Sequence, residues 1–159
     1  WKEVVSFDRI ERGPAGIFRL GVAYPVRATI DGAGVGAIRR CEFSTGAFVE
    51  PITTWDEPRR LAFGVTEQPP PLEEWSPYRR VYAPHLNGYF RSERGEFRLV
   101  AEPGGGTRLE GSTWYRLDIR PRLYWAPMAD AILHGIHQRV LRQVKQNAEA
   151  GATPPVFQP

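Results

Sequence analysis

Apolar and polar residues alternate along most of the middle of the chain, and this two-residue period predicts β-strands. The alternation is clearest in five segments, residues 36–43, 47–55, 59–67, 88–102 and 107–119. Short polar turns at 44–46 and 56–58 and a glycine-rich turn at 103–106 join neighbouring segments, as in antiparallel hairpins. We therefore expect an antiparallel sheet of about six strands.

The period changes near the C-terminus, where apolar residues recur every three or four positions. Over residues 123–148 this apolar stripe consists of Ile132, Leu133, Ile136, Val140 and Val144. The spacing predicts one long amphipathic helix, and residues 1–7 suit the end of a short helix. A run of strands followed by a helix is typical of an α+β protein in which the helix covers one face of the sheet.

The pattern indicates one domain over residues 1–150 and a tail over residues 151–159 that we expect to fray. Residues 68–88 interrupt the strands with five prolines and several aromatic residues, a composition that excludes regular structure. We interpret this segment as a long loop that packs across the mouth of a pocket.

Composition narrows the class of partner. The 159 residues are 42% hydrophobic and 12% aromatic, which favours a large apolar interior or cavity. The net charge of +3 is spread along the chain and forms no basic run, so we expect no nucleic-acid partner. The single cysteine, Cys41, excludes an internal disulfide, and we interpret it as a small buried hydrophobic residue and not as a nucleophile.

No apolar run approaches the roughly 18–20 residues that a membrane-spanning helix needs, and no signal peptide is visible. These observations favour a cytoplasmic protein without a membrane span. The chain begins at Trp1 and not at an initiator methionine. A preceding anchor or signal therefore stays open as an alternative, and with it attachment to a membrane.

Several spaced residues in the strand region form a pattern that resembles a known superfamily. The pattern comprises Gly34-x-Gly36-x-x-Arg39, Thr45-Gly46, Glu50 and Trp55-x-x-Pro58-x-x-Leu61. Together with residues 1–7, the glycine turn and the long final helix, it is similar to START-like (SRPBCC) proteins of the polyketide cyclase/dehydrase type. The resemblance covers nearly the whole chain and rests on fold motifs, without a catalytic signature.

The resemblance implies a helix-grip fold, in which a curved antiparallel sheet wraps around the C-terminal helix and leaves a deep cavity between them. A strand normally precedes the first helix in this superfamily, so we expect the first strand upstream of Trp1. Members bind hydrophobic molecules such as lipids, sterols and polyketides. The leading expectation is therefore a domain that binds a hydrophobic small molecule or lipid, without a cofactor. The alternatives are a polyketide cyclase or dehydratase and a chaperone-binding or assembly module.

Gly32, Gly34 and Gly36 are spaced as in some nucleotide-binding loops. Such a loop must open a helix whose N-terminus faces the phosphate, whereas these glycines lead into a predicted strand. We therefore interpret them as a flexible turn at the rim of the cavity.

Two of the three histidines, His134 and His137, lie about one turn apart in the predicted helix. With Asp130 they share a narrow strip of its surface, which would suit three zinc ligands. The usual helical metal pair is His-x-x-x-His, however, and no acidic general base lies between these two, so we predict no metal site. We predict instead that His134 is exposed and that His137 approaches the cavity, either as part of its wall or as a hydrogen-bonded core residue.

Glu50 lies in the middle of a predicted strand, on the same face as Phe48 and Ile52. If that face is buried, the carboxylate needs a partner, and Arg40 on the neighbouring strand is the candidate. We favour a structural ion pair. The alternative is a general acid or base whose pKa is raised by desolvation.

Two further groups of residues are candidates for the cavity wall. In the last predicted strand, one face carries Leu109, Thr113, Tyr115 and Leu117, and Tyr115 would supply a hydroxyl group. His85 lies among aromatic residues near the end of the proline-rich segment, where it would provide one polar group in an aromatic wall. The alternative for His85 is a loop residue that bonds backbone carbonyls.

The predicted ligand-binding residues are Phe48, Ile52, Phe63, Tyr82, His85, Tyr89, Leu109, Thr113, Tyr115, Leu133, Ile136 and His137. The candidates for proton transfer are Glu50, His85, Tyr115 and His137. No serine- or cysteine-based nucleophile motif is present.

Overall fold

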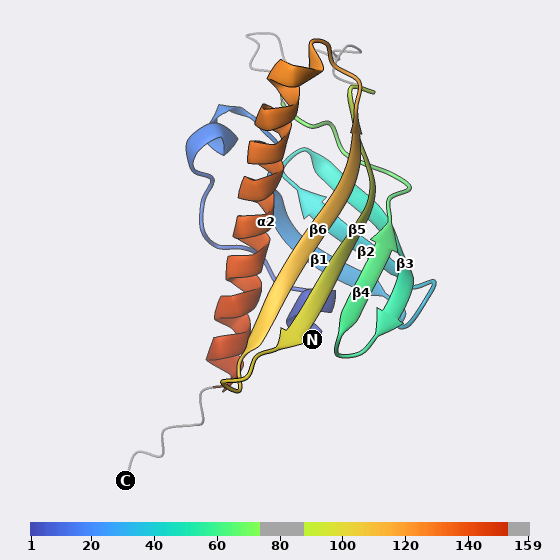
Figure 1. Ribbon diagram of the computed structural model, residues 1–159, viewed down its shortest axis with the longest axis vertical. Helices are drawn as coiled ribbons and strands as arrows, with labels where there is room; N and C mark the ends of the chain where they lie inside the picture. Colours follow the sequence, from blue (N-terminus) through green and yellow to red (C-terminus); the bar gives the residue numbers. More distant parts are fainter. Residues whose placement is uncertain (74–87, 153–159) are drawn as a thin grey trace.

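The computed structural model describes residues 1–73 and 88–152. Six antiparallel strands form one sheet, and each strand pairs with the next along the chain. The strands are β1 (Pro25–Asp31), β2 (Ile38–Phe43), β3 (Gly46–Asp56), β4 (Arg60–Gly64), β5 (Phe90–Ala101) and β6 (Thr107–Leu117). The long helix α2 (Arg122–Ala152) lies along the curved sheet, beside β6 (Figure 1). The expected α+β protein with an antiparallel sheet and a long C-terminal helix is confirmed.

The segment before the sheet contains the short helix α1 (Lys2–Val5) and the 3-10 helix η1 (Gly16–Leu20). Between them, Phe7 and Ala28 exchange two backbone hydrogen bonds of 3.0 and 3.1 Å, which tie this segment to the edge of β1. The N-terminal segment is therefore part of the folded body.

Arg139 of α2 also holds the N-terminal segment. Its guanidinium donates to the carbonyl oxygens of Gly13 and Pro25, each at 3.1 Å, and to that of Arg12. The same group lies over the ring of Tyr24, 5.1 Å from the centroid. Farther along the helix, Asn147 donates to the carboxylate of Glu3 at 2.8 Å.

The turn between β2 and β3 determines which residues face each other across these strands. Phe43 pairs with Gly46, so the turn consists of Ser44 and Thr45 alone. From this start the register places Arg39 directly opposite Glu50. Because neighbouring side chains on a strand point to opposite faces, the length of this turn selects which arginine meets Glu50.

Two elements differ from the expected boundaries. The strand β1 was not predicted, although the segment carries the signal: Val26, Ala28 and Ile30 alternate with polar residues, and the two-residue period would have found it. The helix α2 continues to Ala152, past the expected end at 148. The rest of the predicted tail, residues 153–159, lies outside the described residues, as does most of the predicted loop 68–88.

The filled part of the core lies where the N-terminal segment, the first four strands and the second half of α2 meet. Its buried residues are Val4, Val5, Phe7, Ile10, Ala28, Ala37, Cys41, Ile52, Leu61, Phe63, Val140 and Val144. Only the last two come from α2, so the half of the helix before Val140 contributes no residue to this cluster. Within residues 1–73 and 88–152, no helix combines the length and the hydropathy that crossing a membrane requires.

Candidate functional site

A cavity of about 300 Å³ lies between the first half of α2 and the sheet. The helix presents one face to it, with the three- and four-residue spacing of an amphipathic helix. The helical wall consists of Trp125, Met128, Ala129, Ile132, Leu133, Ile136, His137 and Val140. Strands β2 to β6 form the opposite wall, and residues 22–23 and 68–72 contribute to it. Most of these side chains are apolar, so the cavity is suited to an apolar molecule.

Aromatic rings cover much of the wall on the side of the sheet. Phe43 and Phe48 meet edge to face with centroids 4.9 Å apart, and Phe63 and Phe97 lie 6.1 Å apart. The ring of Phe63 rests on Gly95, which it faces in the register of β4 and β5. A Cβ atom at this glycine would lie 2.5 Å from the ring, so only glycine leaves room for Phe63 in this position.

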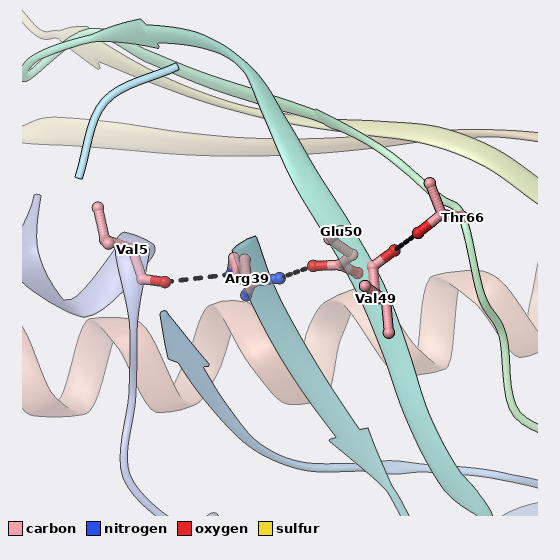
Figure 2. A network of polar contacts seen from close by, with 5 residues as sticks. All are labelled: Val5, Arg39, Val49, Glu50 and Thr66. Atoms are coloured by element: carbon pink, nitrogen blue, oxygen red, sulfur yellow. Dashed lines mark hydrogen bonds and ion pairs between the residues drawn. The ribbon is translucent and has the colours of Figure 1, made fainter. Parts of the chain in front are cut away.

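An ion pair between Arg39 of β2 and Glu50 of β3 lies in the same wall. Figure 2 shows Arg39 between the backbone of Val5 and the carboxylate of Glu50. Its Nε donates to the carbonyl oxygen of Val5 at 3.1 Å, and Nη1 donates to Oε2 of Glu50. The guanidinium also lies over the rings of Phe63 and Phe97, at 5.4 and 5.6 Å from their centroids. The two side chains are only 2% and 8% exposed.

Burial changes the ionisation of the groups around this pair. Desolvation raises the pKa of Glu50, and the positive charge of Arg39 opposes that rise. Desolvation also raises the pKa of the neighbouring Cys41 to about 12, so its thiol stays protonated at neutral pH. The predicted reading of Cys41 as a buried residue without nucleophilic character agrees with this environment.

Two other polar residues of the wall are occupied by contacts within the protein. Glu96 binds Arg60 through Oε2 at 2.7 Å and Arg98 through Oε1. Gln68 donates from Nε2 to the carbonyl oxygen of Phe90 at 2.7 Å and accepts the backbone N–H of Ser92 at 2.9 Å. Both side chains therefore stabilise the cavity wall through these contacts.

The two helical histidines have different surroundings. His137 lines the cavity, and its Nε2 is 2.8 Å from Oγ1 of Thr113 on β6. Desolvation, followed by the nearby His134, lowers the pKa of His137, so its ring is neutral at pH 7. His134 is exposed. The structure thus separates the two histidines as their positions on the helix predicted.

The acidic residue of the considered zinc cluster has another partner. Asp130 accepts a hydrogen bond of 2.5 Å from the hydroxyl group of Tyr115. Burial, together with this hydrogen bond, raises the pKa of Tyr115 to about 12. Among residues 1–73 and 88–152, no three His, Cys, Asp or Glu side chains are arranged to hold a metal ion.

The structure brings many of the predicted residues to one cavity. Those that line it are Phe48, Glu50, Phe63, Tyr89, Thr113, Leu133, Ile136 and His137. Ile52 and Leu109 instead belong to or pack against the filled core. Tyr82 and His85 lie outside the described residues.

Three expectations need correction. The partner of Glu50 is Arg39 and not Arg40, which is exposed. Tyr115 stacks on Phe90, with centroids 5.1 Å apart, and does not line the cavity. The glycine turn at 32–36 joins β1 to β2 away from the cavity wall.

Sequence reasoning missed the part of the wall near the start of α2. Trp125, Met128 and Ala129 continue the apolar stripe backwards from Ile132 in steps of three and four. Extending the helical period in that direction would have found them. Glu96 and Phe97 are consecutive on β5, and both line the cavity. Strand alternation would place them on opposite faces, so it could not identify both.

No protein-family model matches the chain, and no curated protein matches its sequence.

Proposed function

We propose that this protein binds a hydrophobic small molecule or lipid in the cavity between the sheet and α2. The observation that carries the proposal is the cavity itself, with its volume of about 300 Å³ and its largely apolar wall. Ligand pockets commonly occupy roughly 300–1,000 Å³ and combine such walls with a few placed polar groups. The START-like resemblance of the sequence points to the same arrangement and forms part of the proposal.

The cavity is a partly open hollow and not a sealed void. Interiors pack as densely as organic crystals and leave few spaces larger than a water molecule. At roughly 30 Å³ per molecule in the liquid, many water molecules would be needed to fill the cavity. An apolar wall offers those waters few hydrogen bonds, whereas an apolar ligand removes apolar surface from water on entering. The cavity therefore favours an apolar occupant.

A second candidate function is acid–base catalysis of the cyclase or dehydratase type. It is favoured by the presence of Glu50 and His137 on the wall of one cavity. The charge of Arg39 opposes the rise in the pKa of Glu50, however, and His137 is bonded to Thr113 through Nε2. We rank catalysis below binding for this reason. A chaperone-binding or assembly role, which predicts a filled core, ranks third.

The test uses a neutral fluorescent probe, N-phenyl-1-naphthylamine, and a pair of matched variants on α2. Ala129 lines the cavity, whereas Ala131, two residues on, is exposed and does not line it. Both substitutions with phenylalanine carry the same cost in helix propensity. We expect the wild-type protein to bind the probe, Ala129→Phe to weaken binding at least about tenfold, and Ala131→Phe to leave it unchanged.

Thermal melts of both variants accompany the titrations, because a loss of folding would also abolish binding. A wild-type protein that does not bind the probe, or equal affinities for the two folded variants, would contradict the proposal.

A further inference from the structure

The polar groups of the cavity differ in whether they are free to meet a ligand. Arg39 is the only lysine or arginine among the described residues that line the cavity. Its donors are directed to Val5 and Glu50, and two aromatic rings cover the guanidinium. With a side chain only 2% exposed, it has almost no surface left for an anionic ligand.

Glu50 is in a different position. Arg39 binds its Oε2, and no described residue contacts its Oε1. This second oxygen is not sealed inside the protein, because no sealed side-chain nitrogen or oxygen among residues 1–73 and 88–152 lacks a partner. Since Glu50 is buried in the sheet and lines the cavity, Oε1 opens onto the cavity.

The remaining polar groups do not compete for this role. Both oxygens of Glu96 are bound by arginines, and both ends of Gln68 bond to the backbone. His137 bonds to Thr113 through Nε2, and its Nδ1 donates or accepts according to the tautomer, so it does not discriminate between kinds of ligand. Ser92, Ser112 and Tyr89 line the cavity with hydroxyl groups that both donate and accept, so they do not discriminate between kinds of ligand. Trp125 also lines it, and its indole N–H only donates, so it does not compete for a donor group of the ligand. Glu50 is therefore the lining residue that selects for a particular hydrogen-bonding group on the ligand.

We propose that Oε1 of Glu50 anchors the hydroxyl group of an otherwise apolar ligand, an alcohol or a phenol. The inference rests on the proposed binding function and names the class of ligand. A carboxylate oxygen accepts hydrogen bonds only, so the complementary group on the ligand must be a donor. Hydrogen bonds to a charged acceptor are among the stronger ones in proteins.

The charges of the lining residues argue against two other anchoring groups on the ligand, a carboxylate and an ammonium. A ligand carboxylate would meet Arg39, the one cation among the described lining residues, already paired, and it would face the carboxylates of Glu50 and Glu96. A ligand ammonium would find Glu50 already neutralised by Arg39, so it would lose its hydration without a countercharge of its own. A neutral hydroxyl group avoids both costs.

The test compares four probes with one skeleton: naphthalene, 2-naphthol, 2-naphthoate and 2-naphthylmethylammonium. Dissociation constants are measured at pH 7 by displacement of N-phenyl-1-naphthylamine. We expect 2-naphthol to bind the wild-type protein about tenfold more tightly than naphthalene does, and both ions to bind more weakly than 2-naphthol. Equal or tighter binding of naphthalene, of 2-naphthoate or of the ammonium would overturn the inference.

Two double variants test whether the preference for 2-naphthol over naphthalene depends on the ion pair of Arg39 and Glu50. Replacing Glu50 alone would strand a buried charge, so the pair is removed together in Arg39→Met/Glu50→Leu. We expect the affinity ratio of 2-naphthol to naphthalene to fall to one or below in this variant. The control is Arg27→Met/Glu42→Leu, which removes an exposed pair that does not line the cavity, and its ratio should stay that of the wild type. A preference that survives in the first variant contradicts the role of Glu50.

The outcomes separate the inference from the proposed function. If the wild-type protein binds neither naphthalene nor the fluorescent probe, the binding function fails and the inference fails with it. If naphthalene binds and Ala129→Phe weakens its binding, but 2-naphthol has no advantage, the inference alone fails. If the double variant does not fold, the four probes on the wild-type protein still decide the question.

Discussion

The sheet contains two arginine–glutamate pairs that are alike in position and unlike in surroundings. Arg27 lies directly opposite Glu42 across β1 and β2, and Arg39 lies directly opposite Glu50 across β2 and β3. The first pair forms two hydrogen bonds of 2.7 Å, and its side chains are 52% and 37% exposed. The second pair is almost completely buried.

The comparison shows that geometry alone does not determine what an ion pair contributes. Water can replace either partner of the exposed pair, so losing one partner leaves the other hydrated. Water cannot reach the buried pair in the same way, so each of its partners depends on the other. Arg39 and Glu50 therefore act as one unit, whereas Arg27 and Glu42 act as two surface residues.

The largest effect is expected from breaking the buried pair on one side. Glu50→Leu leaves the Arg39 guanidinium without its counterion, and we expect the free energy of unfolding to fall by about 3–5 kcal/mol. Glu42→Leu on the exposed pair is the matched control, for which little change is expected. Urea-induced unfolding followed by circular dichroism measures both. Similar losses in the two variants would show that burial does not separate the pairs.

A smaller effect is expected when both buried charges are removed. Arg39→Met/Glu50→Leu leaves no unpaired charge, although it loses the hydrogen bond from Arg39 to the carbonyl oxygen of Val5. We expect the unfolding free energy of the double variant to return to within about 2 kcal/mol of the wild type. The same urea titrations test this, and a double variant no more stable than Glu50→Leu would argue against coupling between the two residues.

The smallest effect concerns pH, and it has opposite signs for the two glutamates. Burial raises the pKa of Glu50 in the folded protein, so its contribution to stability is present below the ordinary Glu pKa of about 4.3 and is lost as pH rises through its folded pKa. The hydrogen bond from Arg27 lowers the pKa of Glu42, so its contribution is present above the ordinary pKa and is lost as pH falls through its folded pKa.

Unfolding titrations between pH 3 and pH 7 on the two double variants measure these signs. As pH falls, we expect the wild type to gain stability relative to Arg39→Met/Glu50→Leu and to lose it relative to Arg27→Met/Glu42→Leu. The same sign in both comparisons would mean that desolvation does not dominate at Glu50.

The sequence predicted that Glu50 is buried with an arginine partner, but it pointed to the wrong arginine. A three-residue turn over 44–46 would place Glu50 opposite Arg40, whereas the two-residue turn in the structure places it opposite Arg39. A shift of one residue turns a side chain to the other face of the sheet. Alternation identifies the strands, and only the exact turn length gives the partner.

The long helix was more predictable than the cavity wall. The apolar stripe of α2 and the different surroundings of His134 and His137 follow from the helical period alone. Tyr115 shows the limit of the same reasoning on a strand, because its parity agrees with that of Thr113 while its contacts are with Phe90 and Asp130. Leu117 has the same parity and lines the cavity beyond Tyr115, so parity gives the face of a residue but does not show which residues of that face reach the cavity.

The two halves of α2, before and after Val140, also differ in which of their contacts with the rest of the protein water can replace. Before Val140, side-chain hydrogen bonds join the helix to β6, through Asp130 and His137. Solvent can take over such bonds at little net cost. From Val140 onward a hydrogen bond from Asn147 to Glu3 is joined by the close packing of Val140 and Val144 in the core, and water offers no substitute for lost packing contacts. A single helix thus carries contacts that water can replace and contacts that it cannot, and one of the replaceable contacts, the bond between His137 and Thr113, borders the cavity.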